Sequence, residues 1–229
     1  RVRFLAIVTR NLDEFTMKRI GGLKQQIEAD VTETAPDGRT PEEQLAAVHE
    51  TLRPMLAMQA RCYRDAIRPA LAAEGIEILD YDDAPAAEQS ELRTYFEESV
   101  LPTLTPLSFD PAHPFPFISN RSLSLAVLTR HPNAEDPKVT RIKIPPNRPR
   151  LVQLGDDTRY VLLEEVIRAN LDLLLPNVEI VDTALFRLTR NAEVRRNQEI
   201  AEDLIDMVED VLEQRRFASV VRMELSPDA

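Results

Sequence analysis

Asn11 is the residue whose type and surroundings best suit ligand chemistry. An amide side chain can both donate and accept hydrogen bonds, so it can pair with the edge of an adenine ring. Arg10, Lys18 and Arg19 lie close by in the sequence, and a predicted helix begins directly after Asn11. The first N–H groups and the positive dipole end of a helix attract anions. The residues alone leave two interpretations open, a helix N-cap, which they favour, and a ligand contact.

The three histidines are candidate nucleophiles or phosphate ligands, but they occur in unrelated contexts. His113 lies in the stiff, proline-rich run 111–117, where packing by two phenylalanines is favoured over catalysis. His49 falls on the polar face of a predicted helix, and His131 has no partner motif nearby. We therefore assign no catalytic residue within this chain.

Two charged segments are further candidate binding sites. The run 145–150 is a rigid basic connection, for which a surface loop is favoured over an anion contact. An acidic helix face could bind metal, but side chains at this spacing along one helical face are more typical of solvation. Its members are Glu199, Glu202, Asp203, Asp206, Glu209 and Asp210.

The sequence contains no phosphate-binding loop and no metal-binding motif. It has five glycines and one cysteine, and neither Gly-x-x-x-x-Gly-Lys nor Gly-x-Gly-x-x-Gly occurs. No Cys/His cluster has the spacing of a zinc site, so no metal is assigned to these residues.

The net charge of −11 is unevenly distributed. Residues 1–74 hold 11 basic and 11 acidic side chains, so residues 75–229 carry the whole excess of negative charge. A domain with this charge repels DNA, RNA and polyphosphate alike, because binding them depends on clustered Lys and Arg, and nucleic acid is excluded as a partner. Residues 1–24 carry six basic side chains against two acidic ones, and are the segment best suited to meet an anion.

The elements that must position Asn11 are helices. Apolar residues at helical spacing predict a helix from residue 12 to about 33, and a second from about Pro41 to Ala72, with a kink at Pro54. The turn at 36–38 joins them. The pattern predicts an antiparallel helical amino-terminal domain over residues 1–74, completed by a helix that begins before Arg1.

Residues 75–229 change in character and predict an α+β domain with a mixed or antiparallel sheet. Hairpin strands are expected at 122–128 and 139–144, with Arg141 and Lys143 on the solvent face. The other predicted strands cover 76–79, 160–163, 178–188 and 219–225. Helices are predicted at 86–99, from the end of the strand 160–163 through Leu175, and at 198–214.

The compartment and the completeness of the chain can also be inferred. The single cysteine, Cys62, indicates a reducing cytoplasm, with peripheral membrane association left open. No apolar run reaches the ~20 residues of a transmembrane helix. The opening Arg1-Val2-Arg3 and the close at Ser226-Pro227 resemble cuts within a longer chain, so we expect a fragment.

Four segments resemble polyphosphate kinases of the phosphohistidine type, in the family's order. The first runs from Phe4 to Gln26 and includes Asn11-Leu12-Asp13-Glu14-Phe15. The second runs from Leu104 to Asn120 and holds the most specific motif, Asp110-Pro111-Ala112-His113-Pro114-Phe115-Pro116-Phe117. The third is Phe186–Ala192, and the fourth runs from Arg215 to Arg222.

The resemblance implies a helical amino-terminal domain followed by a head domain involved in dimerisation. It implies that the parent protein reversibly transfers the terminal phosphoryl group of ATP to polyphosphate, through a phosphohistidine outside this chain. Magnesium would be bound by the missing carboxy-terminal domains. Asn11 matches an asparagine that contacts the nucleotide in the family, and His113 does not match the phosphorylated histidine.

Two departures and one rival interpretation accompany the resemblance. Arg10 stands where the family commonly has a small polar residue, and Thr16 stands where it has an aromatic one. Both lie beside Asn11, which leaves two alternatives open, a divergent paralogue with an altered nucleotide preference or one whose activity has drifted. The rival interpretation is a non-catalytic oligomerisation or regulatory module, and the isolated chain is expected to be inactive.

Overall fold

The computed structural model describes residues 1–109, 117–132, 136–155, 158–192 and 218–226. The chain forms two compact units. The first comprises residues 1–67, 117–121 and 188–223, and the second comprises residues 68–116, 122–187 and 224–229. The predicted domain boundary after residue 74 stays a prediction.

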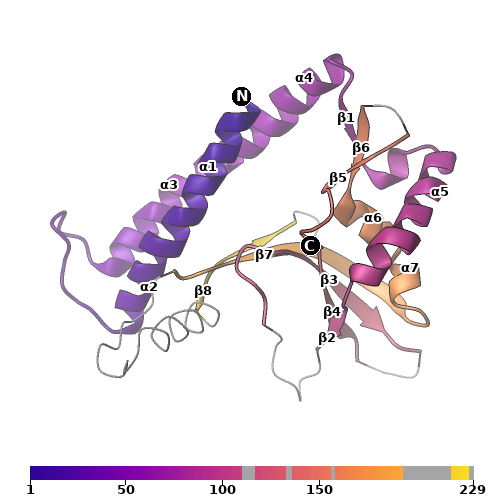
Figure 1. Ribbon diagram of the computed structural model, residues 1–229. Helices are drawn as coiled ribbons and strands as arrows, with labels where there is room; N and C mark the ends of the chain where they lie inside the picture. Colours follow the sequence, from indigo (N-terminus) through magenta and orange to yellow (C-terminus); the bar gives the residue numbers. More distant parts are fainter. Residues whose placement is uncertain (110–116, 133–135, 156–157, 193–217, 227–229) are drawn as a thin grey trace, which may run out of the picture. The chain divides into compact units, whose positions relative to one another are not determined.

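The first unit is built on two long antiparallel helical segments (Figure 1). α1 (Val2–Phe15) continues through a π-helical turn (Thr16–Ile20) into α2 (Gly21–Glu28), and the chain returns as α3 (Pro41–Cys62) and a second π-turn (Tyr63–Ile67). α3 begins with a capping box, in which Thr40 Oγ1 accepts from the Glu43 N–H and Glu43 accepts from the Thr40 N–H. The helical hairpin predicted from the sequence is therefore present.

The predicted start of the first helix is wrong. The helix begins at Val2 rather than after Asn11, and it ends at Glu28, just before Asp30 takes a left-handed conformation with φ of 52°. Residues Val2 to Arg10 include neither Gly nor Pro, so nothing in them stops the helix. Asn11 consequently lies inside α1, where it caps nothing.

The second unit contains most of the two sheets. A mixed three-stranded sheet has the order β1-β6-β5, in which β1 (Glu77–Leu79) runs parallel to β6 (Arg159–Leu162) and β5 (Leu151–Gln153) runs antiparallel to it. A five-stranded sheet has the order β2-β4-β3-β7-β8. Its strands are β2 (Leu107–Ser108), β3 (Leu123–Arg130), β4 (Lys138–Lys143), β7 (Glu179–Arg190) and β8 (Val220–Leu225).

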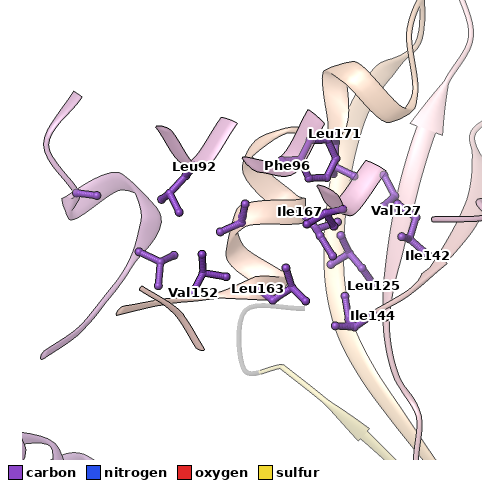
Figure 2. Close-up of a cluster of buried hydrophobic side chains, with 14 of the residues drawn as sticks. Leu92, Phe96, Leu125, Val127, Ile142, Ile144, Val152, Leu163, Ile167 and Leu171 are labelled. Atoms are coloured by element: carbon purple, nitrogen blue, oxygen red, sulfur yellow. The ribbon is translucent and has the colours of Figure 1, made fainter. Parts of the chain in front are cut away.

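Helices cover these sheets and complete an α+β fold, as the sequence predicts. α4 (Arg68–Ala73) leads into β1, α5 (Ala86–Tyr95) continues through a π-turn to Val100, and α6 (Leu163–Ala169) and α7 (Leu171–Leu174) follow β6. Figure 2 shows Phe96, from the π-turn after α5, and Ile167 of α6 beside Leu125 and Val127 of β3 in the main apolar core. Phe96, Val127, Ile142, Leu163 and Ile167 are fully buried there.

The predicted hairpin of β3 and β4 is confirmed, but the predicted environment of Arg141 is wrong. Arg141 is 5% exposed, and its Nε donates to Ser124 Oγ at 3.2 Å. β4 lies between β2 and β3, and its neighbours Thr140 and Ile142 are buried as well. Both faces of β4 are therefore covered at residues 140–142, so alternation does not place Arg141 in solvent. The helix predicted at 198–214 lies outside the described residues.

Candidate functional site

Asn11 lies on the face of α1 that borders α3, and its side chain is exposed. Its amide forms no hydrogen bond with any residue that the structure describes. Because Asn11 is in the interior of the helix, the free N–H groups and dipole end expected beside it are absent. What Asn11 offers a ligand is its side-chain amide alone, one acceptor and two donors.

The surface beside Asn11 is an apolar groove of about 230 Å³ between α1 and α3. Gln59 is the other polar residue along it, and its Nε2 donates to the Leu5 carbonyl at 3.1 Å and to Thr9 Oγ1 at 2.7 Å. These bonds fix α3 against α1 across the groove. The apolar residues that line it are Val8, Leu12, Phe15, Leu52, Met55 and Leu56.

A second groove of about 330 Å³ shares Phe15 and Leu52 with the first and has a different chemistry. Arg19, Arg39 and Asp37 line it, so it combines two cations with one carboxylate. The two grooves adjoin at Phe15 and Leu52, and the first is apolar beside Asn11 while the second is polar at Arg19. An apolar surface with a few convergent polar groups is typical of a small-molecule site.

Arg190, at the end of β7, connects three of the four resembling segments. Its Nε donates to the Ile118 carbonyl at 2.9 Å, and Nη1 donates to the Ala218 carbonyl at 2.7 Å. The guanidinium carbon also lies 5.0 Å from the centre of the Phe117 ring. Burial lowers the pKa of Arg190, in the direction expected for a cation removed from water. We call Arg190 and its three partners, Phe117, Ile118 and Ala218, the Arg190 junction.

The first resembling segment contacts the same region through Met17. The Met17 carbonyl accepts from the Ala192 N–H at 2.9 Å, and the Met17 sulfur accepts from Asn120 Nδ2 at 3.2 Å. Asn120 Oδ1 in turn accepts from the Arg190 N–H at 2.9 Å. The sequence matches these segments separately but does not predict that they meet, because Asn120 lies 70 residues from Arg190 and 103 from Met17.

The other candidates from the sequence that the structure describes do not line these grooves. His49 is exposed on α3 and His131 is exposed after β3, while His113 and the acidic face at 199–210 lie outside the described residues. In the run 145–150, Arg150 Nε donates to Glu164 Oε1 at 2.9 Å, and Glu164 is 1% exposed. Arg150 therefore compensates a buried carboxylate, which supports the structural interpretation of this run over an anion site.

The described residues contain no group of three or more His, Cys, Asp or Glu side chains that could hold a metal. Within the same residues, no helix is long and apolar enough to cross a membrane. Arg19, Arg39, Gln44 and Gln59 were not among the predicted site residues. Arg19 alone carried a signal in the sequence, as part of the basic segment 1–24.

Two family models match the chain. One, described as the polyphosphate kinase N-terminal domain, matches residues 1–79, and the other, described as the polyphosphate kinase middle domain, matches residues 87–229. The polyphosphate kinase of Mycobacterium ulcerans is 43% identical over 238 residues, covering 100% of this chain and 32% of that protein. The polyphosphate kinase of Synechocystis sp. is 42% identical over 238 residues, covering 99% of this chain and 33% of that protein.

A crystal structure of the polyphosphate kinase from Porphyromonas gingivalis has a similar fold. Its TM-score is 0.73 at 23% identity, and the match covers 93% of this chain and 33% of that one. The chain thus spans about a third of the length of the relatives that it matches.

Proposed function

Because this chain belongs to the polyphosphate kinase family, we propose that it is part of a protein that reversibly transfers the terminal phosphoryl group of ATP to polyphosphate. In the proposed reaction a histidine nitrogen outside this chain attacks the γ-phosphorus, and the bond to the β,γ-bridging oxygen breaks to release ADP. A terminal oxygen of polyphosphate then takes the phosphoryl group from the histidine. The helical unit contributes a nucleotide contact through Asn11.

The observation that carries the nucleotide role is the placement of Asn11 beside the apolar groove. Leu12, Phe15 and Leu52 offer apolar surface to a planar base, and the Asn11 amide can pair with the donor and acceptor on its edge. The structure removes the competing explanation of Asn11 as an N-cap, since the residue is inside α1. Magnesium finds no ligand set among the described residues, so the proposal gives it no step in this chain.

The test is Asn11→Ala in the full-length protein. Loss of one hydrogen bond of about 1 kcal/mol raises the Michaelis constant for ATP about five-fold. The melting temperature should not fall, because an exposed alanine is at least as favourable as asparagine inside a helix. Arg3→Gln is the control, since Arg3 is exposed on the same helix but lines neither groove. An unchanged Michaelis constant in the Asn11 variant would refute the nucleotide role.

We also propose that the parent protein is a homo-oligomer, a dimer or higher. Among the described strands β8 lies at the edge of its sheet, and Val220, Met223 and Leu225 on it are exposed, a combination suited to pairing with a second copy. Met223→Lys should shift full-length protein toward monomer in light scattering, whereas Met58→Lys, on the exposed surface of α3, should not. Wild-type protein that is monomeric at micromolar concentration contradicts this proposal.

A further inference from the structure

The second groove has features that the nucleotide role of Asn11 does not use. Arg19 is exposed and lines this groove together with Arg39, which belongs to the connection between α2 and α3. Neither guanidinium forms an ion pair with any side chain in the described part of the chain. Asp37, the carboxylate in the groove, accepts the Arg39 backbone N–H at 3.2 Å. The groove therefore carries a net positive charge at its polar end.

Arg19 is held in place rather than free to swing. Its Nη2 donates to Gln44 Oε1, and Gln44 is 9% exposed. Gln44 Nε2 donates in turn to the Arg39 carbonyl at 3.2 Å, which ties α3 to the backbone of the same groove. One of the five guanidinium N–H groups is used in this contact, so the others remain to meet a ligand.

Arg19 belongs to one of three π-helical turns that the described residues form. Arg19 lies in the π-helical turn Thr16–Ile20, and such turns occur frequently at functional sites. Phe15 and Arg19 both line the second groove, so the aromatic ring and the guanidinium lie on the same side of the helix. Eight residues separate Asn11 from Arg19, which is about 12 Å along a helix. A nucleotide whose base lies beside Asn11 can reach Arg19 with its phosphates.

We propose that Arg19, positioned by Gln44 and assisted by Arg39, binds a phosphoanhydride chain in the second groove. The inference rests on the proposed nucleotide role for assigning the neighbouring groove to the base. A guanidinium is suited to phosphate because it donates in pairs and keeps its charge at any physiological pH. The chain can be the phosphates of the bound nucleotide or the end of a polyphosphate. Both present the same chemistry to Arg19.

Steady-state kinetics of full-length Arg19→Gln test the proposal, with Lys18→Gln as the control. Lys18 is an exposed cation next in sequence that lines neither groove, so its variant removes the same charge without touching the site. A lost charge-assisted contact predicts about a ten-fold rise in a Michaelis constant for Arg19→Gln and less than two-fold for Lys18→Gln. Arg19→Lys should recover only part of the loss.

The substrate affected identifies the source of the phosphates. If the nucleotide supplies them, the constants for ATP and ADP rise, and inhibition by adenosine, which has no phosphate, is unchanged. If polyphosphate supplies the phosphates, the Michaelis constant for polyphosphate rises in the reverse reaction, while the Michaelis constant for ADP is unchanged. Constants within two-fold of wild type for all three substrates overturn the proposal and leave Arg19 as a structural partner of Gln44.

The two proposals can fail separately. An effect of Arg19→Gln with none for Asn11→Ala refutes the base contact and retains the anion site. An effect of Asn11→Ala with none for Arg19→Gln refutes the anion site and retains the base contact. Gln44→Leu adds a test of positioning, because it keeps the Arg19 charge and removes the bond that orients it. It should reproduce part of the Arg19→Gln effect on the same substrate.

Discussion

Gly21 shows how closely the first unit is packed at the level of one residue. A Cβ at Gly21 would overlap the Asn191 amide oxygen and lie 2.6 Å from Asn191 Cγ. Gly21→Ala should therefore lower the free energy of unfolding by about 1–3 kcal/mol, the usual cost of overpacking, despite the better helix propensity of alanine. Urea denaturation measures the change.

A double-mutant cycle separates this clash from other effects of Gly21→Ala. Asn191→Ala removes the atoms that the new methyl group would meet, so Gly21→Ala should cost less in the Asn191→Ala background than in wild type. Equal costs in the two backgrounds would show that the contact does not explain the glycine.

Glu165 on α6 gives a prediction about pH. Burial raises the pKa of Glu165, and Arg168, which pairs with it, offsets this only in part. A carboxyl group with a raised pKa in the folded state favours folding when protonated. Its contribution is thus most favourable below the ordinary glutamate pKa and is lost as pH rises through the raised one.

Glu165→Gln should therefore be more stable than wild type at pH 7, with the difference shrinking toward zero below pH 4. Thermal melts of both proteins from pH 3 to pH 8 measure this. Glu179→Gln, which alters an exposed pair with Arg130, is the control and should change little. A wild-type protein more stable than the Glu165 variant at pH 7 would contradict the prediction.

At the scale of elements, the Arg190 junction holds the end of β7 to two distant segments. Arg190→Met removes donors from the Ile118 and Ala218 carbonyls and should lower the free energy of unfolding by about 3 kcal/mol. Arg190→Lys should recover less than half of this, because an ammonium group lacks the planar fork that reaches both carbonyls. Urea denaturation tests both variants, and equal stability of Arg190→Lys and wild type would show that charge alone suffices.

The same scale shows what could be predicted from sequence. Apolar periodicity identified the helical hairpin and the hairpin of β3 and β4, because burial of one face determines both patterns. The residues favour a cap at Asn11 because the apolar periodicity starts at Leu12 and Glu14 follows Asn11 by three positions. Capping requires a break in the helical backbone, however, and Val2–Arg10 does not supply one. Arg141 was misplaced because alternation cannot reveal a strand covered on both faces.

The contacts that define the candidate site lie beyond such patterns. Arg19 meets Gln44 across 25 residues, and Gln59 meets Leu5 across 54. Neither pairing has a local signature, since each depends on the register of one helix against another. The resemblance supplied Asn11, while the grooves around it and the role of Arg19 required the structure.

At the scale of the whole molecule, the described residues carry the proposed nucleotide contact, and no nucleophile or metal site is assigned among them. Among the described residues no cluster of three or more His, Cys, Asp or Glu side chains could hold a metal. His49 is exposed on α3 and lines neither groove. Phosphoryl transfer needs a positioned nucleophile and charge stabilisation on the transferred group. The 229-residue chain alone should therefore form neither phosphohistidine nor polyphosphate.

Incubation with ATP labelled at the γ-phosphate, in the presence of Mg²⁺, tests this prediction. Full-length protein should acquire acid-labile label and extend polyphosphate, whereas the isolated chain should acquire none at any of His49, His113 or His131. A mixture of both proteins controls for inhibitors in the chain preparation. Stoichiometric label on the isolated chain, lost in one His→Gln variant, would place the nucleophile within these residues and refute the assignment of catalysis to another part of the protein.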